Sequence, residues 1–194
     1  MLTLYMSPGS SSMATHIMLH EIGVEFESRW ISFGKREQHM PEYLALNPEG
    51  KVPTLLVDGQ PLTEVAATLY YLAKRYPPAG LFPEGDLSAE AQIISWMSFI
   101  ASTIHPARRI GVERWKEVFE LAEKHLGRRD WAVGRYSIAD IHLFRLFWRF
   151  YDALHPAREA YPGLCAHYDH MMARPAVRRV LEIESAVGYH WSLE

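Results

Sequence analysis

Strand-forming segments occur only in the first 76 residues, and this restriction limits the available folds more than any other feature. Residues 2–5 (LTLY) and 54–57 (TLLV) are short apolar segments typical of strands. From Ser88 onward, apolar residues recur with the 3.6-residue period of helices. The stretch PPAGLFPEGDL between these regions contains three prolines and two glycines, as linkers do. We therefore expect two domains, residues 1–77 and 88–194, joined by a linker at 78–87.

The elements of the first domain predict one small α/β layer. They are, in order, a strand at 2–5, a helix from 12 to 22, a strand at 26–33, a hairpin that turns at Asp58–Gly59, and a helix from after Glu64 to about Tyr76. This is the order βαβ followed by ββα, and the chain as a whole is expected to be α+β.

The second domain is predicted to be all-helical. Helices are expected at roughly 88–105, 112–127, 138–153, 161–173 and 176–185, with breaks near Pro106, Gly127, Gly134, Pro156 and Pro175. Ser137 and Asp140 have the spacing of a capping box at the start of the third of these helices.

Charge and composition exclude several classes of protein. The formal net charge is −3, so the chain lacks the basic excess that nucleic-acid binding requires, and nucleic acid is not an expected partner. No apolar run reaches the ~18 residues of a membrane span, and the first residues do not have the pattern of a signal peptide. The single cysteine, Cys165, cannot form an internal disulfide. We expect a cytoplasmic protein with no membrane partner.

Three loops of the first domain carry candidate binding groups. The serines at 10–12 follow the first strand, Val52–Pro53 precedes the third, and Glu64–Val65 opens a helix. Ligands of open sheets collect where strands end and helices begin. The free backbone N–H groups at the start of that helix favour a carboxylate, and Glu64 suits an ammonium group, so an amino-acid head group would fit there. From the residues alone, the Val52–Pro53 bond is expected to be trans.

Four segments together resemble a known family. LYMSPGSSSMATHI, NPEGKVPTL, LTEVAATLYYL and WAVGRYSIADIHLF, in this order and spacing, are similar to cytosolic glutathione transferases, most of all to the bacterial beta class. The resemblance spans nearly the whole chain. It implies a thioredoxin-like N-terminal domain that binds glutathione and a helical domain that supplies an apolar pocket for a small hydrophobic electrophile. It also implies a homodimer with a role in detoxification. No metal ion or other cofactor is expected, and glutathione is the cosubstrate.

The resemblance assigns roles around the glutathione backbone. It implies that the Val52–Pro53 bond is cis and that Val52 pairs with the cysteinyl backbone of glutathione. Glu64 and the N–H of Val65 would receive the γ-glutamyl end. Val65 stands where the family usually has Ser or another small residue after Glu, so a lower affinity is expected. Lys35 and Lys51 would attract the carboxylates of glutathione, although surface lysines are common without such a role.

The group that contacts the sulfur is left open among several residues. The beta-class pattern places Ser11 at the position of its cysteine, whereas the pattern of insect delta-like relatives selects Ser10. Both serines also suit plain helix capping, as does Ser12. Tyr5 is an alternative hydroxyl donor or a core residue. His105 falls where beta-class proteins carry a histidine that faces the sulfur.

Two functions follow from this resemblance. In the first, a serine hydroxyl and a helix N-terminus stabilise the glutathione thiolate, which attacks an apolar electrophile. The alternative is a non-catalytic glutathione-binding or scaffold protein, which Val65, the missing cysteine and an apparently shortened segment before Ser137 favour. A thiol-disulfide reductase is disfavoured because no cysteine lies near the site. The C-terminal residues Tyr189, His190 and Trp191 could fold back over the electrophile site, or fray.

Overall fold

The computed structural model describes residues 1–189, which form two compact units. The first unit comprises Met1–Tyr76 together with the described residues from Ala176, 176–189, and the second comprises Pro77–Pro175. The last helix thus groups with the first unit, although the sequence indicated a second domain of 88–194. The boundaries expected from the sequence stay a prediction. Tyr189 donates a hydrogen bond to the Leu181 carbonyl over 3.2 Å; His190 and Trp191 lie outside the described residues.

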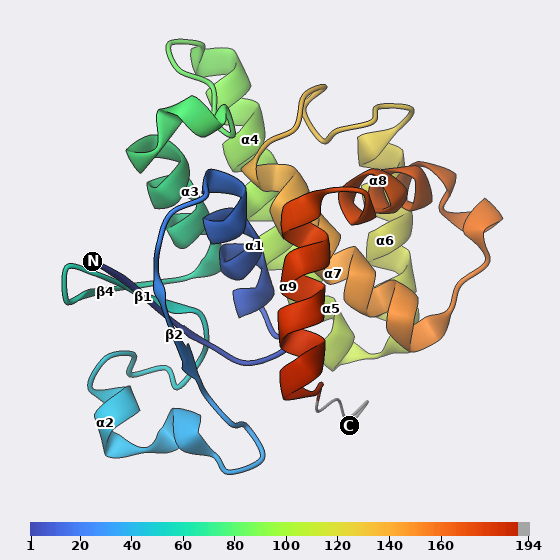
Figure 1. Cartoon of the computed structure of the whole chain (residues 1–194). Helices are drawn as coiled ribbons and strands as arrows, with labels where there is room; N and C mark the ends of the chain where they lie inside the picture. Colours follow the sequence, from blue (N-terminus) through green and yellow to red (C-terminus); the bar gives the residue numbers. More distant parts are fainter. Residues whose placement is uncertain (190–194) are drawn as a thin grey trace. The chain divides into compact units, whose positions relative to one another are not determined.

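The first unit is built on a four-stranded mixed sheet in the order β2-β1-β3-β4. Its strands are β1 (Leu2–Met6), β2 (Glu27–Trp30), β3 (Thr54–Val57) and β4 (Gln60–Thr63). β1 runs parallel to β2 and antiparallel to β3, which forms a hairpin with β4. Asp58 and Gly59 form the turn of this hairpin with φ values of 50° and 84°, as a two-residue turn of this kind requires. The predicted βαβ-ββα order is confirmed (Figure 1).

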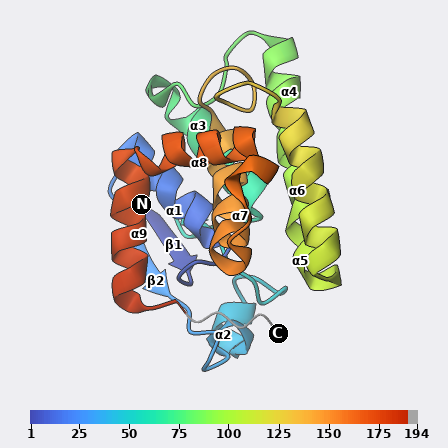
Figure 2. The same ribbon diagram turned by 90° about the vertical axis from the view of Figure 1, so that its right-hand side faces the viewer.

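Helices pack on this sheet through apolar side chains. The helical segments of the first unit are α1 (Ser12–Ile22), η1 (Glu37–His39), α2 (Pro41–Leu44), α3 (Val65–Arg75) and α9 (Pro175–Val187), of which only the first residue, Pro175, belongs to the second unit. Leu4 and Leu55 of the sheet are fully buried together with Ile17 of α1 and Leu69 of α3, because each points its apolar side chain into the shared core. α9 lies beside α1 in both views (Figures 1 and 2).

The second unit is entirely helical. Its segments are η2 (Pro77–Ala79), α4 (Leu87–Phe99), a π-helical segment η3 (Ile100–Ile104), α5 (His105–Ile110), α6 (Val112–Leu126), α7 (Ile138–Leu154), η4 (Arg158–Ala160) and α8 (Pro162–Met172). α7 is its central helix, with 12 buried residues among 17. Phe119 of α6 packs against Phe147 and Phe150 of α7 at centroid distances of 5.4 and 4.4 Å. The predicted capping box of Ser137 and Asp140 is present.

Three local expectations from the sequence were wrong or incomplete. The helical chain does not stop near Pro106, because a new helix, α5, begins at His105 directly after η3 and extends to Ile110. Pro106 lies in the first turn of α5, where a proline removes no needed hydrogen bond. The strand expected at 26–33 is only four residues long. The expected linker is partly packed: Leu81 and Phe82 are buried, and the Leu81 carbonyl accepts a hydrogen bond from the Ile138 N–H over 3.1 Å. No helix within residues 1–189 has the length and apolar character needed to cross a membrane.

Candidate functional site

Three loops converge at one end of the sheet. The register pairs Tyr5 of β1 with Thr54 of β3, and Thr54 with Thr63 of β4. β1 ends one residue after Tyr5, β3 begins at Thr54 and β4 ends at Thr63. The serine loop, the Val52–Pro53 segment and the Glu64–Val65 helix start therefore leave the sheet from the same end, as the sequence predicted.

The serine loop is fixed by hydroxyl groups. The Ser12 hydroxyl accepts a hydrogen bond from the Ser7 N–H over 3.1 Å and donates to the Ser7 carbonyl over 3.2 Å, which ties the start of α1 to the end of β1. The Ser10 hydroxyl accepts from the Ser12 N–H over 3.2 Å and lies 2.8 Å from the Ser12 hydroxyl. Ser10 and Ser12 thus form hydrogen bonds within the loop at the start of α1, and a contact of Ser10 with the sulfur stays a prediction.

Ser11 differs from its two neighbours in burial. Ser12 is fully buried and Ser10 is 8% exposed, whereas Ser11 is only half-buried. Ser11 occupies the N-cap position of α1 but makes no side-chain capping bond there. The N-cap lies next to the unpaired N–H groups of the first helical turn, where the helix dipole favours negative charge. Ser11 is the most exposed of the three serines, and its contact with a ligand stays a prediction.

The carboxylate of Glu184 on α9 also contacts the serine loop. Glu184 is fully buried, and its Oε2 accepts a hydrogen bond from the Gly9 N–H over 2.6 Å. Its Oε1 lies 2.8 Å from Nδ1 of His16, which is also buried, on α1. One side chain thereby fixes both the loop that precedes the serines and the helix that follows them.

The Val52–Pro53 peptide bond is cis, as the family resemblance implied. Val52 is buried in a small apolar cluster with Ile31 and Tyr43. The Lys51 carbonyl accepts hydrogen bonds from the Tyr43 hydroxyl over 2.5 Å and from the Asn47 amide over 2.8 Å. These contacts hold the backbone on the N-terminal side of Val52 in one position. Burial raises the pKa of Tyr43, which keeps its hydroxyl protonated as a donor.

Tyr5 packs into the same cluster. It is half-buried, its ring centroid lies 5.6 Å from that of Tyr43, and it contacts the group formed by Ile31, Tyr43 and Val52. The ring of Tyr5 thus packs in this cluster, and its role as a hydroxyl donor stays a prediction.

At the start of α3, the carboxylate of Glu64 is exposed, whereas the side chains of Val65 and Thr68 are buried. Glu64 is exposed at the N-cap with φ 68° and ψ 126°, and Val65 is 6% exposed. The Thr68 hydroxyl donates to the Val65 carbonyl over 2.9 Å and lies 2.8 Å from the hydroxyl of Thr15 on α1. This buried hydroxyl pair connects the two helices whose N-termini border the candidate site.

The two candidate lysines and the candidate histidine are exposed. Lys35 and Lys51 are both exposed. The ammonium of Lys51 is 2.5 Å from a carboxylate oxygen of Glu49, so it already has a partner. His105 is the exposed first residue of α5 in the helical unit.

The helical unit also holds buried basic groups on α7. His142 and Arg145 are 2% and 4% exposed. Burial, with added effects of His105 and Arg145, lowers the pKa of His142 to about 3. Burial and Arg108 lower the pKa of Arg149 to about 10, against the opposing effect of Asp152. The apolar pocket for the second substrate, which the family resemblance implied, stays a prediction.

Several supporting residues were missed by the sequence analysis. Glu184 had one detectable signal: with Val177 and Val180 it occupies the buried stripe of α9, where a carboxylate is unusual. Tyr43 lies in a segment without clear periodicity, so no pattern marked it. Asn47 opens the NPEGKVPTL segment, but the resemblance gave its side chain no role.

Comparison with known proteins gives a consistent result. Residues 1–74 match the family model of the glutathione S-transferase N-terminal domain, and residues 94–175 match that of the C-terminal domain. Glutathione S-transferase GST-4.5 of Xanthomonas campestris is 30% identical over 93% of this chain and 98% of its own.

Two solved structures extend this similarity. A sphingomonad glutathione S-transferase complexed with glutathione is 34% identical, with a TM-score of 0.83 over 94% of this chain and 98% of its own. The bacterial beta class glutathione S-transferase of Sphingomonas chungbukensis is 32% identical, with the same TM-score and coverage.

Proposed function

The chain belongs to the glutathione S-transferase family, and on that premise we propose that it is an enzyme that activates the thiol of glutathione for attack on an electrophile. The observation that carries the proposal is the convergence of three loops at one end of the sheet, where two helix N-termini and the edge next to Val52 meet. Similar structures from a sphingomonad and a Sulfitobacter contain glutathione, which supports the same ligand here.

Glutathione would lie extended along this edge. The γ-glutamyl carboxylate faces the N-terminus of α3 at Val65, and the exposed Glu64 carboxylate receives the ammonium group. The backbone of Val52 pairs with the cysteinyl residue as an added strand would. Lys35 and Lys51 contribute long-range attraction at most, since both are exposed and Lys51 is paired with Glu49.

The sulfur would lie at the N-terminus of α1. Lowering a thiol pKa from ~8.5 to ~6.5 requires about 2.7 kcal/mol of selective thiolate stabilisation. One charge-assisted hydrogen bond supplies about 1.5 to 3 kcal/mol, and the helix dipole adds to it. We assign the bond to Ser11, because Ser10 is buried and its hydroxyl serves Ser12. A hydroxyl cannot form a mixed disulfide with glutathione, so the chemistry is transfer rather than disulfide exchange.

The electrophile would be a small hydrophobic molecule received by the helical unit, where His105 is the candidate for a proton or orienting role. Positioning the thiolate and its target accounts for most of the acceleration in such a reaction. A homodimer, a role in detoxification and a cytoplasmic location complete the proposal, and each rests on the family resemblance or on the single cysteine. The non-catalytic scaffold is not favoured, because the named relatives are glutathione S-transferases over nearly their whole length.

The ultraviolet absorbance of the bound thiolate, followed against pH, tests this proposal. We expect the bound thiol to titrate ~1 to 2 units below ~8.5, and Ser11→Ala to reverse most of that shift. Ser10→Ala is the matched control, since it removes a neighbouring hydroxyl that bonds within the protein: it should lower stability but leave the thiol pKa nearly unchanged. A thiol that titrates as in free glutathione would establish the scaffold alternative instead.

A further inference from the structure

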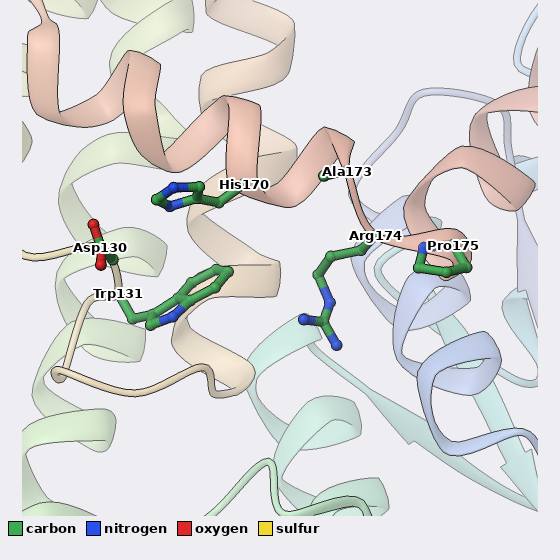
Figure 3. Close-up of a pocket in the computed structure, with 6 residues that line it drawn as sticks. All are labelled: Asp130, Trp131, His170, Ala173, Arg174 and Pro175. Carbon is green, nitrogen blue, oxygen red and sulfur yellow. The ribbon is translucent and has the colours of Figure 1, made fainter.

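A hollow of about 460 Å³ lies at the end of α8, formed by residues of the helical unit alone. It is lined by Asp130, Trp131, His170, Ala173, Arg174 and Pro175. In Figure 3 the indole of Trp131 lies below the imidazole of His170, and the side chain of Arg174 extends beside them from the end of α8. This volume falls within the range of small-molecule sites in proteins.

The ring of Tyr136 packs against both Trp131 and Arg174, two of the residues that line the hollow. The guanidinium carbon of Arg174 lies 3.6 Å from the ring centroid of Tyr136, a close cation–π contact. The same ring lies 5.0 Å from the Trp131 ring. Both Trp131 and Arg174 are half-buried, so their conformations are restricted before any ligand arrives. Such pre-organisation reduces the entropy that binding costs.

The indole has further ring neighbours that hold it in place. Its centroid lies 5.6 Å from that of His170 and 5.9 Å from that of the buried His167. Ala173 and Pro175 also line the hollow and carry short side chains. A planar ring that enters the hollow could stack on the indole of Trp131.

The charged side chains that line the hollow favour a negatively charged ligand. Arg174 is the cation that lines it, and a guanidinium offers several donors in one plane for a carboxylate. Asp130 lies on the far side of Trp131 from Arg174 in Figure 3 and is exposed, so water screens its repulsion of an anion. His170 is also exposed and can offer a hydrogen bond.

We propose that this hollow is a binding site for a small aromatic carboxylate, whose ring stacks on Trp131 and whose carboxylate pairs with Arg174. The site consists of residues outside the glutathione edge, so it does not depend on the transferase assignment. It gives the helical unit a ligand-binding role of its own.

The test uses the whole protein labelled with 5-fluorotryptophan and titrated with 2-naphthoate. The six tryptophans give separate fluorine resonances, and Trp131→Phe identifies the signal of Trp131. We expect naphthoate to shift that signal saturably, with or without excess glutathione. The uncharged 2-naphthalenemethanol carries the same rings and should bind about tenfold more weakly.

Two variants and one control separate this site from others. Arg174→Gln should weaken naphthoate binding about tenfold, whereas Arg178→Gln, an exposed arginine outside the hollow, should not change it. If Arg174→Gln does not fold, Ala173→Leu fills the hollow and should abolish the Trp131 shift. Equal affinity for the acid and the alcohol, or naphthoate binding that leaves the Trp131 signal unmoved, overturns the proposal.

Discussion

The Nδ1 atom of His16 lies 2.8 Å from Oε1 of Glu184, where both side chains are almost completely buried. The second oxygen of Glu184 accepts from the Gly9 N–H just before the serine loop. A buried donor that loses its acceptor costs about 1 to 3 kcal/mol, and Glu184→Ala removes the acceptor of two donors. We expect a loss of about 3 kcal/mol in the free energy of unfolding, measured by urea titration.

The control for this change lies on the same helix. Glu182 is exposed, and its pair with Arg179 is a surface ion pair, so Glu182→Ala should cost under about 1 kcal/mol. Similar losses for the two variants would show that the burial of Glu184 contributes little.

Asp140 is a second buried acceptor, in the helical unit. It accepts from the Ala132 N–H over 2.7 Å, from the Ser137 N–H over 2.8 Å and from the Ser137 hydroxyl over 3.0 Å, and lies 3.1 Å from Nε2 of His167. Asp140→Ala should destabilise the protein by about 3 kcal/mol or more, as seen by thermal unfolding. Asp169→Ala removes an exposed aspartate of the same charge and should cost under about 1 kcal/mol.

The buried imidazole of His142 predicts a pH dependence of stability. Its pKa is lowered from 6.5 to about 3 in the folded protein, chiefly by burial. The unfolded chain therefore binds more protons between these values, so stability is full above about 6.5 and falls as pH drops through the window. The loss is about 1.4 kcal/mol per pH unit. Between pH ~7 and ~5, His142→Gln should lose about 2 kcal/mol less than the parent protein. Parallel pH profiles would contradict this account.

Gly50 and Gly59 can be compared to separate the cost of backbone conformation from the cost of a steric clash. Both have positive φ, at 61° and 84°. A Cβ at Gly50 would lie 2.9 Å from the Gln38 carbonyl oxygen and 2.9 Å from His39 Nδ1, whereas one at Gly59 would meet nothing within 4 Å. Gly59→Ala should cost about 1 kcal/mol from its backbone conformation alone.

Gly50→Ala should cost more, because the loop that ends at Val52 must move. For the Gly50→Ala variant, we expect the dissociation constant for glutathione, measured by calorimetry, to rise several-fold. The dissociation constant of the Gly59→Ala variant should stay near the parent value. Unchanged glutathione affinity in Gly50→Ala would show that this loop does not position the ligand.

The sequence predicted the features that arise from local patterns. The change of apolar period near Ser88, the Asp58–Gly59 turn and the Ser137 capping box each depend on neighbouring residues, and all three are present. The short helical segments at 37–44 were missed, because they contain too few residues to show a helical period.

Features that depend on contacts between residues far apart in the sequence could not be predicted from local patterns. Glu184 meets Gly9 across 175 positions of sequence, and only folding brings them together. The choice between Ser10 and Ser11 likewise depends on burial, since both fit the same local motif. The cis form of Val52–Pro53 followed from the family resemblance, whereas the residues alone favoured trans.

The packing of α9 into the first unit sets an order of events during synthesis. Domains commonly fold from the N-terminus while the ribosome is still adding residues. Here Gly9 and His16 emerge early, but their acceptor, Glu184, is added only after the whole helical unit has been translated. The thioredoxin-like half therefore gains the contacts of Glu184 last, although it is made first. In a nascent chain interrupted before α9, only the loop's own hydroxyl bonds would hold the serine loop.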